Sequence, residues 1–312
     1  MSTLILCFHR VADPAHGGRS LLSIAPEDFR KTLETVGSRF TFVELAEGAE
    51  PSRTRKAVVT FDDGYADNLH TAMPILQDMG IPATFFISTG FIGTDYLYPP
   101  DALDAYFSST DHSDVSPQLG SLLADGYWTA LDHVSSMDEE HYWQVLREVG
   151  QRVRGDVLAA DPLRRPMSLG ELRDLAALPG VTLGPHTVTH RRLSSLSPAE
   201  AIGEFVMSLE WLESQGFGVE DFFAYPFGQR PDMVKALSAG IRKHGVEPLT
   251  TLPALVSDAS RFHLDGWGTP RLSVGPAEVP LIPLLLQVLP IASAFAPLWL
   301  GALALRRKFI AG

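Results

Sequence analysis

The amino-acid sequence predicts an α/β fold, specifically an incomplete barrel of parallel strands and helices. Short apolar segments of strand length alternate along the chain with amphipathic segments of helical spacing, which is typical of a parallel sheet covered by helices. We count about six or seven such units, more than a small open sheet holds comfortably. The 312 residues suffice for a large core, and no internal repeat is visible.

The alternation is regular from the N-terminus to Gly93. In the first helical segment Phe29, Leu33 and Val36 fall on one face. The expected elements, in chain order, are a strand at 4–8, a helix at 25–36, strands at 40–43 and 57–61, a helix at 66–79 and a strand at 84–88.

The segment 94–166 breaks this rhythm. It is polar and irregular, with helical fragments such as 138–149, so we expect an insertion that covers one face of the domain.

The alternation resumes at Met167. The helix at 198–215 is the best-marked element, because Ser197 and Glu200 form a capping box around Pro198 and Gly216 follows the last turn. The other expected elements are a helix at 169–178, strands at 181–183 and 222–225, a helix at 232–238 ended by Gly240, and a strand at 271–274.

Charge and cysteine content exclude several classes of protein. Lys and Arg total 25 against 37 Asp and Glu, and the resulting net charge of −12 disfavours nucleic-acid binding. The single cysteine, Cys7, excludes an internal disulfide framework and a multi-cysteine metal site.

Polar clusters follow two of the predicted strands, at the edge where α/β folds place catalytic groups. Asp62 and Asp63 end one strand, and His186 and His190 end another. Taken alone, an Asp–Gly pair could be an ordinary turn or helix cap, and the two histidines could lie on the surface. Together, one aspartate and two histidines form the three-ligand set of a catalytic metal site, with the second carboxylate beside it as a base.

A third cluster ends a strand with the turn Pro226-Phe227-Gly228. The backbone N–H of Phe227 lies at this sharp turn and could stabilise an oxyanion, although the same tripeptide also occurs in ordinary turns.

The three motifs, in this order, resemble those of the polysaccharide deacetylase family. Thr60-Phe-Asp-Asp-Gly64, His186-Thr-x-x-His190 and Phe223-Ala-Tyr-Pro-Phe-Gly228 are similar to motifs of the NodB homology domain, carbohydrate esterase family four, in the branch with an AYPYG-like third motif. The segments "LCFHRV", "GIPATFFI" and "TPRLSV" are similar too. The resemblance covers about residues 4–93 and 167–274 and implies a distorted, incomplete (β/α) barrel with a helical insertion.

The resemblance also implies a reaction. Members of the family hydrolyse N-acetyl groups, and sometimes O-acetyl groups, of amino sugars with a divalent metal ion. By motif, Asp62 resembles the catalytic base, Phe227 the residue whose backbone amide binds the oxyanion, and Asp63, His186 and His190 the metal ligands. Zinc is the expected ion, and cobalt, nickel or manganese would accept the same ligands.

Two departures from the family pattern affect the catalytic groups. Many members carry an arginine at the position of Ala224, where it pairs with the base. Arg271 is our candidate replacement, although a surface ion pair would explain this residue equally well. The late Leu-x-Leu-His motif, source of the general acid, is absent, and the early histidine of the AYPYG-like branch points to His9 instead. Alternatively, His9 is only a hydrogen-bonded residue at a strand end.

The apolar C-terminal tail, 276–312, differs in composition from the catalytic domain, which we place at 1–275. Val279–Leu305 carries no charge over 27 positions, contains four prolines and is followed by three basic residues. Since no secretory signal is visible, we expect a cytoplasmic protein whose tail contacts the inner face of the plasma membrane. Packing of the tail on the domain or an oligomer partner, or a true span, are the alternatives.

The expected function is therefore metal-dependent removal of N-acetyl groups from an amino-sugar-containing polysaccharide or a lipid-linked saccharide. Tyr96, Tyr98 and Trp128 in the insertion favour a glycan cleft, although they could equally be core residues. Hydrolysis of a small non-glycan amide and a catalytically silent carbohydrate-binding protein are the alternatives.

Overall fold

The centre of the molecule is a six-stranded parallel sheet in the order β11-β1-β5-β6-β7, with β4 beside the first residues of β5. The computed structural model describes residues 3–13, 22–50, 52–109, 116–229, 232, 234–251, 269–275, 278–279 and 282. The strands are β1 (Thr3–Phe8), β4 (Thr41–Phe42), β5 (Lys56–Phe61), β6 (Ala83–Ile87), β7 (Val181–Pro185) and β11 (Leu272–Ser273).

A second parallel sheet continues the curvature of the first. It has the order β10-β9-β8, with β8 at Phe222–Ala224, β9 at Glu247–Thr250 and β10 at Thr269–Pro270. Leu183 of β7 forms a single β-bridge with Val219, and the Arg271 N–H donates to the Thr250 carbonyl at 2.9 Å. The two sheets therefore meet at both edges without a continuous ladder, and the predicted incomplete (β/α) barrel is confirmed. A short pair, β2 (Arg10–Val11) and β3 (Ser23–Ile24), lies beside it.

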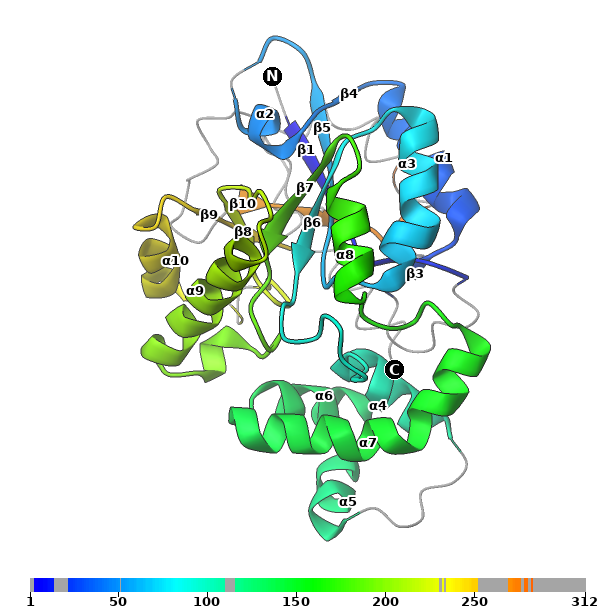
Figure 1. The fold of residues 1–312 in the computed structure, drawn as a ribbon, viewed down its shortest axis with the longest axis vertical. Helices are drawn as coiled ribbons and strands as arrows, with labels where there is room; N and C mark the ends of the chain where they lie inside the picture. The colour runs from blue at the N-terminus through cyan, green and yellow to red at the C-terminus, as the bar shows by residue number, and fades with distance from the viewer. Residues whose placement is uncertain are drawn as a thin grey trace.

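Helices cover the outer faces of the sheets (Figure 1). On one side lie α1 (Pro26–Gly37), α3 (Met73–Met79) and α8 (Leu169–Ala176), and on the other lie α9 (Pro198–Ser214) and α10 (Lys235–Arg242). The predicted capping box of α9 is present: Ser197 Oγ accepts from the Glu200 N–H, and the Glu200 side chain accepts from the Ser197 N–H. The remaining helical segments here are α2 (Leu45–Ala49), the π-helical turn η3 (Asn68–Ala72) and the 3₁₀ turn η4 (Leu193–Ser195).

The pleat of the central strands decides which side chains face the barrel interior. Along β1, Leu6 and Phe8 pack outward against the helices, whereas Ile5 packs inward with Val58 and Phe86. Because side chains alternate along a strand, Cys7 shares the inner face with Ile5. The same alternation on β5 directs Asp62, which follows the strand, towards the interior.

The predicted insertion is a helical layer at the carboxyl ends of the central strands (Figure 1). It comprises α4 (Pro99–Ser108), α5 (Pro117–Leu123), α6 (Tyr127–Ser135) and α7 (Glu139–Ala160). These helices bury an apolar cluster of their own, separate from the core beneath the sheet. None of the helices in the described ranges is both long and apolar enough to span a membrane.

Three expected helices differ from the observed ones. The helix expected at 66–79 is divided between the π-helical turn η3 and α3. The helix expected at 232–238 is α10, Lys235–Arg242, and contains Gly240 instead of ending there. A Cβ on Gly240 would lie 3.1 Å from Ile202, so this glycine permits close packing of α10 on α9. The fragment expected at 138–149 extends to Ala160 as α7, because Gly150 and Gly155 keep a negative φ and continue the helix. The strand β9 was not predicted.

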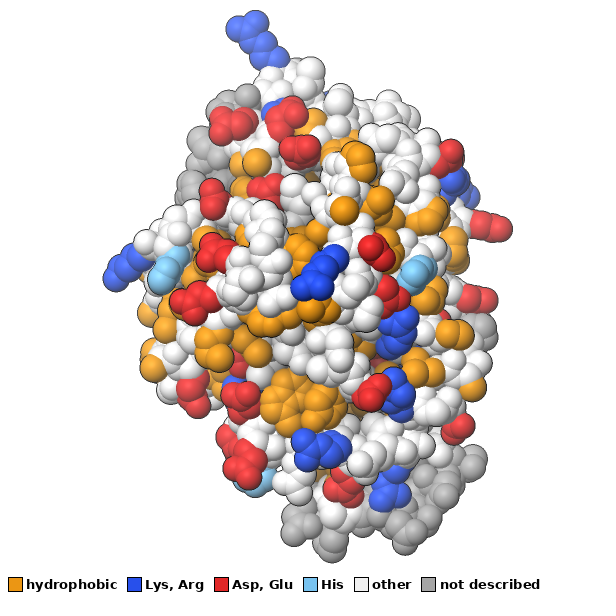
Figure 2. Space-filling view, viewed as in Figure 1, with side chains coloured by type: hydrophobic (Ala, Val, Ile, Leu, Met, Phe, Trp, Pro, Cys, Tyr) orange, Lys and Arg blue, Asp and Glu red, His pale blue; other side chains and the backbone are white. Residues whose placement is uncertain are grey.

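Acidic and basic side chains are interspersed over the face shown in Figure 2. Apart from Val279 and Ile282, the predicted tail segment Val279–Leu305 lies outside the described residues, and so do most positions after 275. The domain boundary at 275 and the membrane contact therefore stay predictions.

Candidate active site

The three predicted ligands converge at the carboxyl ends of β5 and β7. Asp63 Oδ1 lies 3.3 Å from His186 Nε2 and 3.1 Å from His190 Nε2, and all three side chains are buried. One ligand atom from each residue lies within 4.8 Å of the other two. Strands β5, β6 and β7 are parallel neighbours, so the loops that follow them open at one edge of the sheet.

The donor set fits a divalent cation. The His186 Nδ1 atom lies 2.7 Å from the Ala224 carbonyl, which fixes the proton on Nδ1 and leaves the Nε2 lone pair directed at Asp63. The Asp63 Oδ1 atom is buried and makes no hydrogen bond within the described part of the chain. A cation shared by the carboxylate and the two imidazoles would satisfy this oxygen. Burial raises the pKa of the Asp63 carboxyl, but the neighbouring His190 and His186 hold it well below its usual value.

Backbone strain concentrates at the same place. Within the described residues, the non-glycine residues with positive φ are Asp63 (75°), Thr187 (69°), His190 (57°) and Phe227 (61°). All four belong to the predicted motifs. Each such conformation costs about 1–3 kcal/mol and persists only where surrounding contacts impose it.

Glu204 of α9 supplies many of those contacts to the histidine loop. Its carboxylate accepts hydrogen bonds from the backbone N–H groups of Val188 and Thr189, both at 2.9 Å, and from the Thr189 hydroxyl. Arg191 Nη2 lies 3.0 Å from the same carboxylate and neutralises it. The sequence analysis did not identify Glu204, because its partners lie 13 to 16 residues earlier in the chain.

The helical insertion contributes two further anchors. The Tyr98 hydroxyl donates to the backbone carbonyl of Asp63 at 2.7 Å, and the Tyr142 hydroxyl donates to the Thr189 carbonyl at 2.6 Å. Both tyrosines are buried. Tyr98 is therefore a support beneath the ligands and not a cleft residue. Trp128 is 49% exposed, and the partly buried Tyr96 packs on Trp143 with ring centroids 4.9 Å apart.

Arg271 pairs with Asp62. Its Nη1 and Nη2 atoms lie 2.6 and 2.7 Å from the two carboxylate oxygens, and both residues are buried. This is a bidentate pair in the barrel interior and not a surface ion pair. Burial raises the pKa of the Asp62 carboxyl, but Arg271 outweighs this effect and holds the pKa below its usual value.

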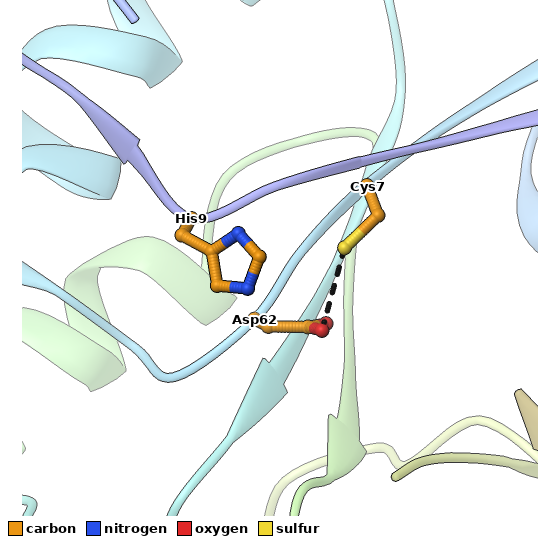
Figure 3. A group of neighbouring side chains, drawn as sticks. All are labelled: Cys7, His9 and Asp62. Atoms are coloured by element: carbon orange, nitrogen blue, oxygen red, sulfur yellow. Dashed lines mark hydrogen bonds between the residues drawn. The ribbon is translucent and has the colours of Figure 1, made fainter. Parts of the chain in front are cut away.

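His9 and Cys7 lie on either side of the Asp62 carboxylate (Figure 3). The Cys7 thiol donates to Asp62 Oδ2 at a sulfur–oxygen distance of 3.4 Å. Burial lowers the pKa of His9, although Asp63 and Asp62 oppose the change. The sequence analysis did not assign Cys7 to the site; the two-residue spacing between Cys7 and His9 was the signal that both could face the interior.

The third motif lies against the metal ligands. The Phe227 ring centroid is 5.1 Å from that of His190, and the Arg192 guanidinium carbon lies 4.7 Å from the Phe227 ring centroid. The Phe227 carbonyl accepts a hydrogen bond from Thr251. A Cβ on Gly228 would lie 2.6 Å from the Thr251 nitrogen, so only glycine fits there. The structure places Phe227 beside the candidate metal centre, and the oxyanion role of its amide stays a prediction.

Sequence comparison identifies a family for part of the chain. Residues 49–152 match the model of the family described as polysaccharide deacetylase. The matched range contains Asp62 and Asp63 and extends into the insertion, whereas the histidine motif and the third motif lie outside it. No curated protein matches the chain at a significant level.

Solved structures share the fold. IcaB from Ammonifex degensii matches with a TM-score of 0.57 and 16% identity, over 91% of this chain and 96% of that chain. The deacetylase PplD of Streptococcus pyogenes, solved in complex with acetate, matches with a TM-score of 0.55 and 17% identity, over 92% and 97%. A polysaccharide deacetylase from Bacillus cereus matches with a TM-score of 0.54 and 16% identity, over 88% and 65%.

At these identities the structural likeness concerns the fold alone. The assignment to the branch with an AYPYG-like third motif stays a prediction. The match over residues 49–152 and the shared fold together confirm the resemblance of this chain to the polysaccharide deacetylase family.

Proposed function

We propose that this chain is a metal-dependent hydrolase that removes N-acetyl groups from an amino-sugar-containing polysaccharide or a lipid-linked saccharide. One observation carries the proposal: the buried Asp63, His186 and His190 converge beside a second carboxylate, Asp62, that an arginine holds ionised. A three-ligand site next to a fixed base is the arrangement that metal-assisted hydrolysis requires.

Asp63, His186 and His190 would hold the ion. A divalent cation bound there would polarise the acetamide carbonyl and the attacking water. The Asp62 carboxylate accepts a proton from that water, which then attacks the carbonyl carbon. The backbone N–H of Phe227 donates a hydrogen bond to the carbonyl oxygen as negative charge develops on it.

His9 is the group proposed to protonate the leaving nitrogen, so that the C–N bond breaks to give acetate and a free amine. Because burial lowers its pKa, His9 loses its proton at a lower pH than an exposed histidine does. A general acid acts only while protonated, so the rate should fall as pH rises through this lowered pKa. His9→Gln should remove that descending limb of the pH–rate profile.

Acetate release with added metal tests the proposal. His186→Ala removes a ligand and should abolish both activity and stoichiometric metal binding. Asp62→Asn keeps the three ligands and should bind metal while losing about 10²–10⁴ in rate. His141→Ala is the control, because this histidine is exposed on α7 and should behave as wild type. Wild-type rates in both site variants would refute the assignment.

The substrate is tested in the same assay. N-acetylated glycans and lipid-linked saccharides are compared with small acetamides at equal acetyl concentration. Release from the small amides alone would favour the alternative activity, a small-amide hydrolase. Binding of glycans without any release would favour the silent carbohydrate-binding alternative. Zinc, cobalt, nickel and manganese are each supplied to the metal-free protein to identify the ion that supports the highest rate.

We also propose that the protein is cytoplasmic and contacts the inner face of the plasma membrane through Val279–Leu305. The charge-free length of this segment and the basic residues after it support the proposal. Fractionation of the full chain against a form ending at Gly275 tests it. Equal recovery of both forms in the detergent-free supernatant would exclude membrane contact.

A further inference from the structure

We propose that Cys7, His9 and Asp62 form a second cation site, which takes a thiophilic divalent ion such as zinc or cadmium and blocks catalysis when filled. The site lies beside the candidate metal centre and shares none of its ligands. Binding of the ion is independent of the proposed function, whereas the inhibition rests on it.

The strand geometry brings these three ligands together. Cys7 and His9 are two residues apart at the end of β1, so their side chains point to the same side, and β1 pairs in parallel with β5, which Asp62 follows. The thiol, imidazole and carboxylate donor atoms lie within 4.8 Å of one another (Figure 3).

The spacing of sulfur and oxygen suits zinc. Cys7 Sγ lies 3.4 Å from Asp62 Oδ2. Bond lengths of about 2.3 Å to sulfur and about 2.0 Å to oxygen, at a tetrahedral angle, give a separation of about 3.5 Å. The two atoms are therefore already placed as neighbouring ligands of one ion.

The hydrogen-bond pattern locates the position of the ion. The thiol donates to Asp62 Oδ2, so a lone pair of that oxygen is directed at the sulfur. A divalent cation would replace the thiol proton: the S–H bond breaks, the proton leaves to solvent, and the thiolate, carboxylate and imidazole bind the ion.

Arg271 selects for a soft ion. It keeps both contacts with the Asp62 carboxylate, and its charge opposes a second cation nearby. The carboxylate alone is therefore a poor site for magnesium or calcium, and the thiolate supplies the affinity. Cys7 is fully buried and His9 is half-buried, so the ion would enter past the imidazole. Once bound, it occupies both the proposed base and the proposed general acid.

The single cysteine of the chain makes this site directly observable. The full chain, loaded with one equivalent of zinc, is titrated with cadmium, and an ultraviolet charge-transfer band of a cadmium–thiolate bond can arise only from Cys7. We expect a saturable band, no band in Cys7→Ser, and an affinity lower by about tenfold or more in His9→Gln.

The second arm measures acetate release against added zinc, with each variant compared with its own rate at one equivalent. Wild type and the surface control His141→Ala should lose activity as zinc exceeds one equivalent. Cys7→Ser keeps a hydroxyl donor for Asp62 but lacks the thiolate, and should resist the same concentrations. Cys7→Ala replaces it if the serine variant fails to fold.

Two results would overturn the proposal: the lack of a thiolate band in folded wild type, or equal inhibition of wild type and Cys7→Ser. A band in a protein that releases acetate from no substrate would refute the proposed function and support the cation site. Failure of this site and failure of the proposed function are therefore distinguishable.

Discussion

The barrel and the helical insertion both reach the candidate metal centre, but they contribute different groups. The barrel supplies the candidate metal ligands and the candidate base and acid, from the ends of β1, β5 and β7. The insertion supplies hydroxyl groups that hold the backbone of those residues, through Tyr98 and Tyr142. The insertion thus contributes contacts that fix the position of the candidate groups, but none of the candidate groups themselves.

The barrel and the insertion differ in this way because a strand can fix the backbone only up to its last residue. A strand end fixes one backbone position, but the residues after it leave the ladder and adopt positive φ at Asp63 and His190. Contacts from outside the strands must then impose that conformation. Glu204 does this from the barrel side and the two tyrosines do it from the insertion side, so the relative weight of the two sides can be measured.

Among the residues that support the site, the largest effect on activity should come from the barrel interior, at Arg271. Arg271→Gln leaves the Asp62 carboxylate buried without its cation, which should cost about 3–5 kcal/mol of stability. The pKa of Asp62, now held below its usual value, should rise, so the acid limb of the pH–rate profile moves to higher pH. We expect a rate loss of about 10²-fold or more at neutral pH. Arg271→Lys keeps the charge and should shift the limb less; an unshifted limb in Arg271→Gln would contradict the role assigned to the pair.

Glu204 on the barrel side should have the next largest effect. Glu204→Gln removes the charge that pairs with Arg191 and weakens the bonds to the 188–189 backbone. We expect metal affinity to fall by about 10–100-fold. Glu210→Gln, on the exposed face of the same helix, is the matched control. Chelator competition measures the affinity, and equal values for the two variants would remove Glu204 from the support of the site.

The insertion side should show a smaller effect. Tyr142→Phe leaves the buried Thr189 carbonyl without its hydroxyl donor, at a cost of about 1–3 kcal/mol. Tyr98→Phe removes one of the two donors of the Asp63 carbonyl, which keeps the hydrogen bond from the Ser88 N–H. We expect a decrease of about tenfold in metal affinity for each variant. Tyr127→Phe removes a longer hydroxyl–carbonyl contact inside the insertion, 3.4 Å to Pro100. If Tyr127→Phe weakens metal binding as much as Tyr98→Phe does, the effect is general destabilisation and not positioning.

The smallest effect should come from the polar contact that joins the two regions, and the quantity it changes is the free energy of unfolding. Arg10 of the barrel bridges Asp67 and Asp161, and burial raises the pKa of Asp67 from 3.8 to about 6 despite the nearby Arg10. Because the folded pKa is the higher one, the stabilising contribution of Asp67 is complete below pH 3.8 and is lost as pH rises through about 6.

Asp67→Asn removes this titration. The free energy of unfolding of wild type should therefore fall relative to that of Asp67→Asn as the pH rises from about 4 to about 6. Urea unfolding at several pH values measures the difference. A constant difference across this window would show that Asp67 does not titrate there.

The sequence by itself determined the fold class and the candidate site residues that the fold brings together. Parallel strands show as short apolar runs, and their carboxyl ends meet at one edge, so the residues after two strands could be assigned to one site before their positions were known. The candidate ligands Asp63, His186 and His190 and the neighbouring Asp62 followed from these local patterns.

Only the tertiary structure decided what holds these residues in place. Arg271 lies 209 residues from Asp62, and neither Tyr98 nor Glu204 belongs to a motif. A local pattern records burial and periodicity along one segment, but a hydrogen bond between distant segments depends on how helices pack over the sheet. For the same reason, the contact of Cys7 with Asp62 depends on the register of β1 with β5, which no local pattern predicts.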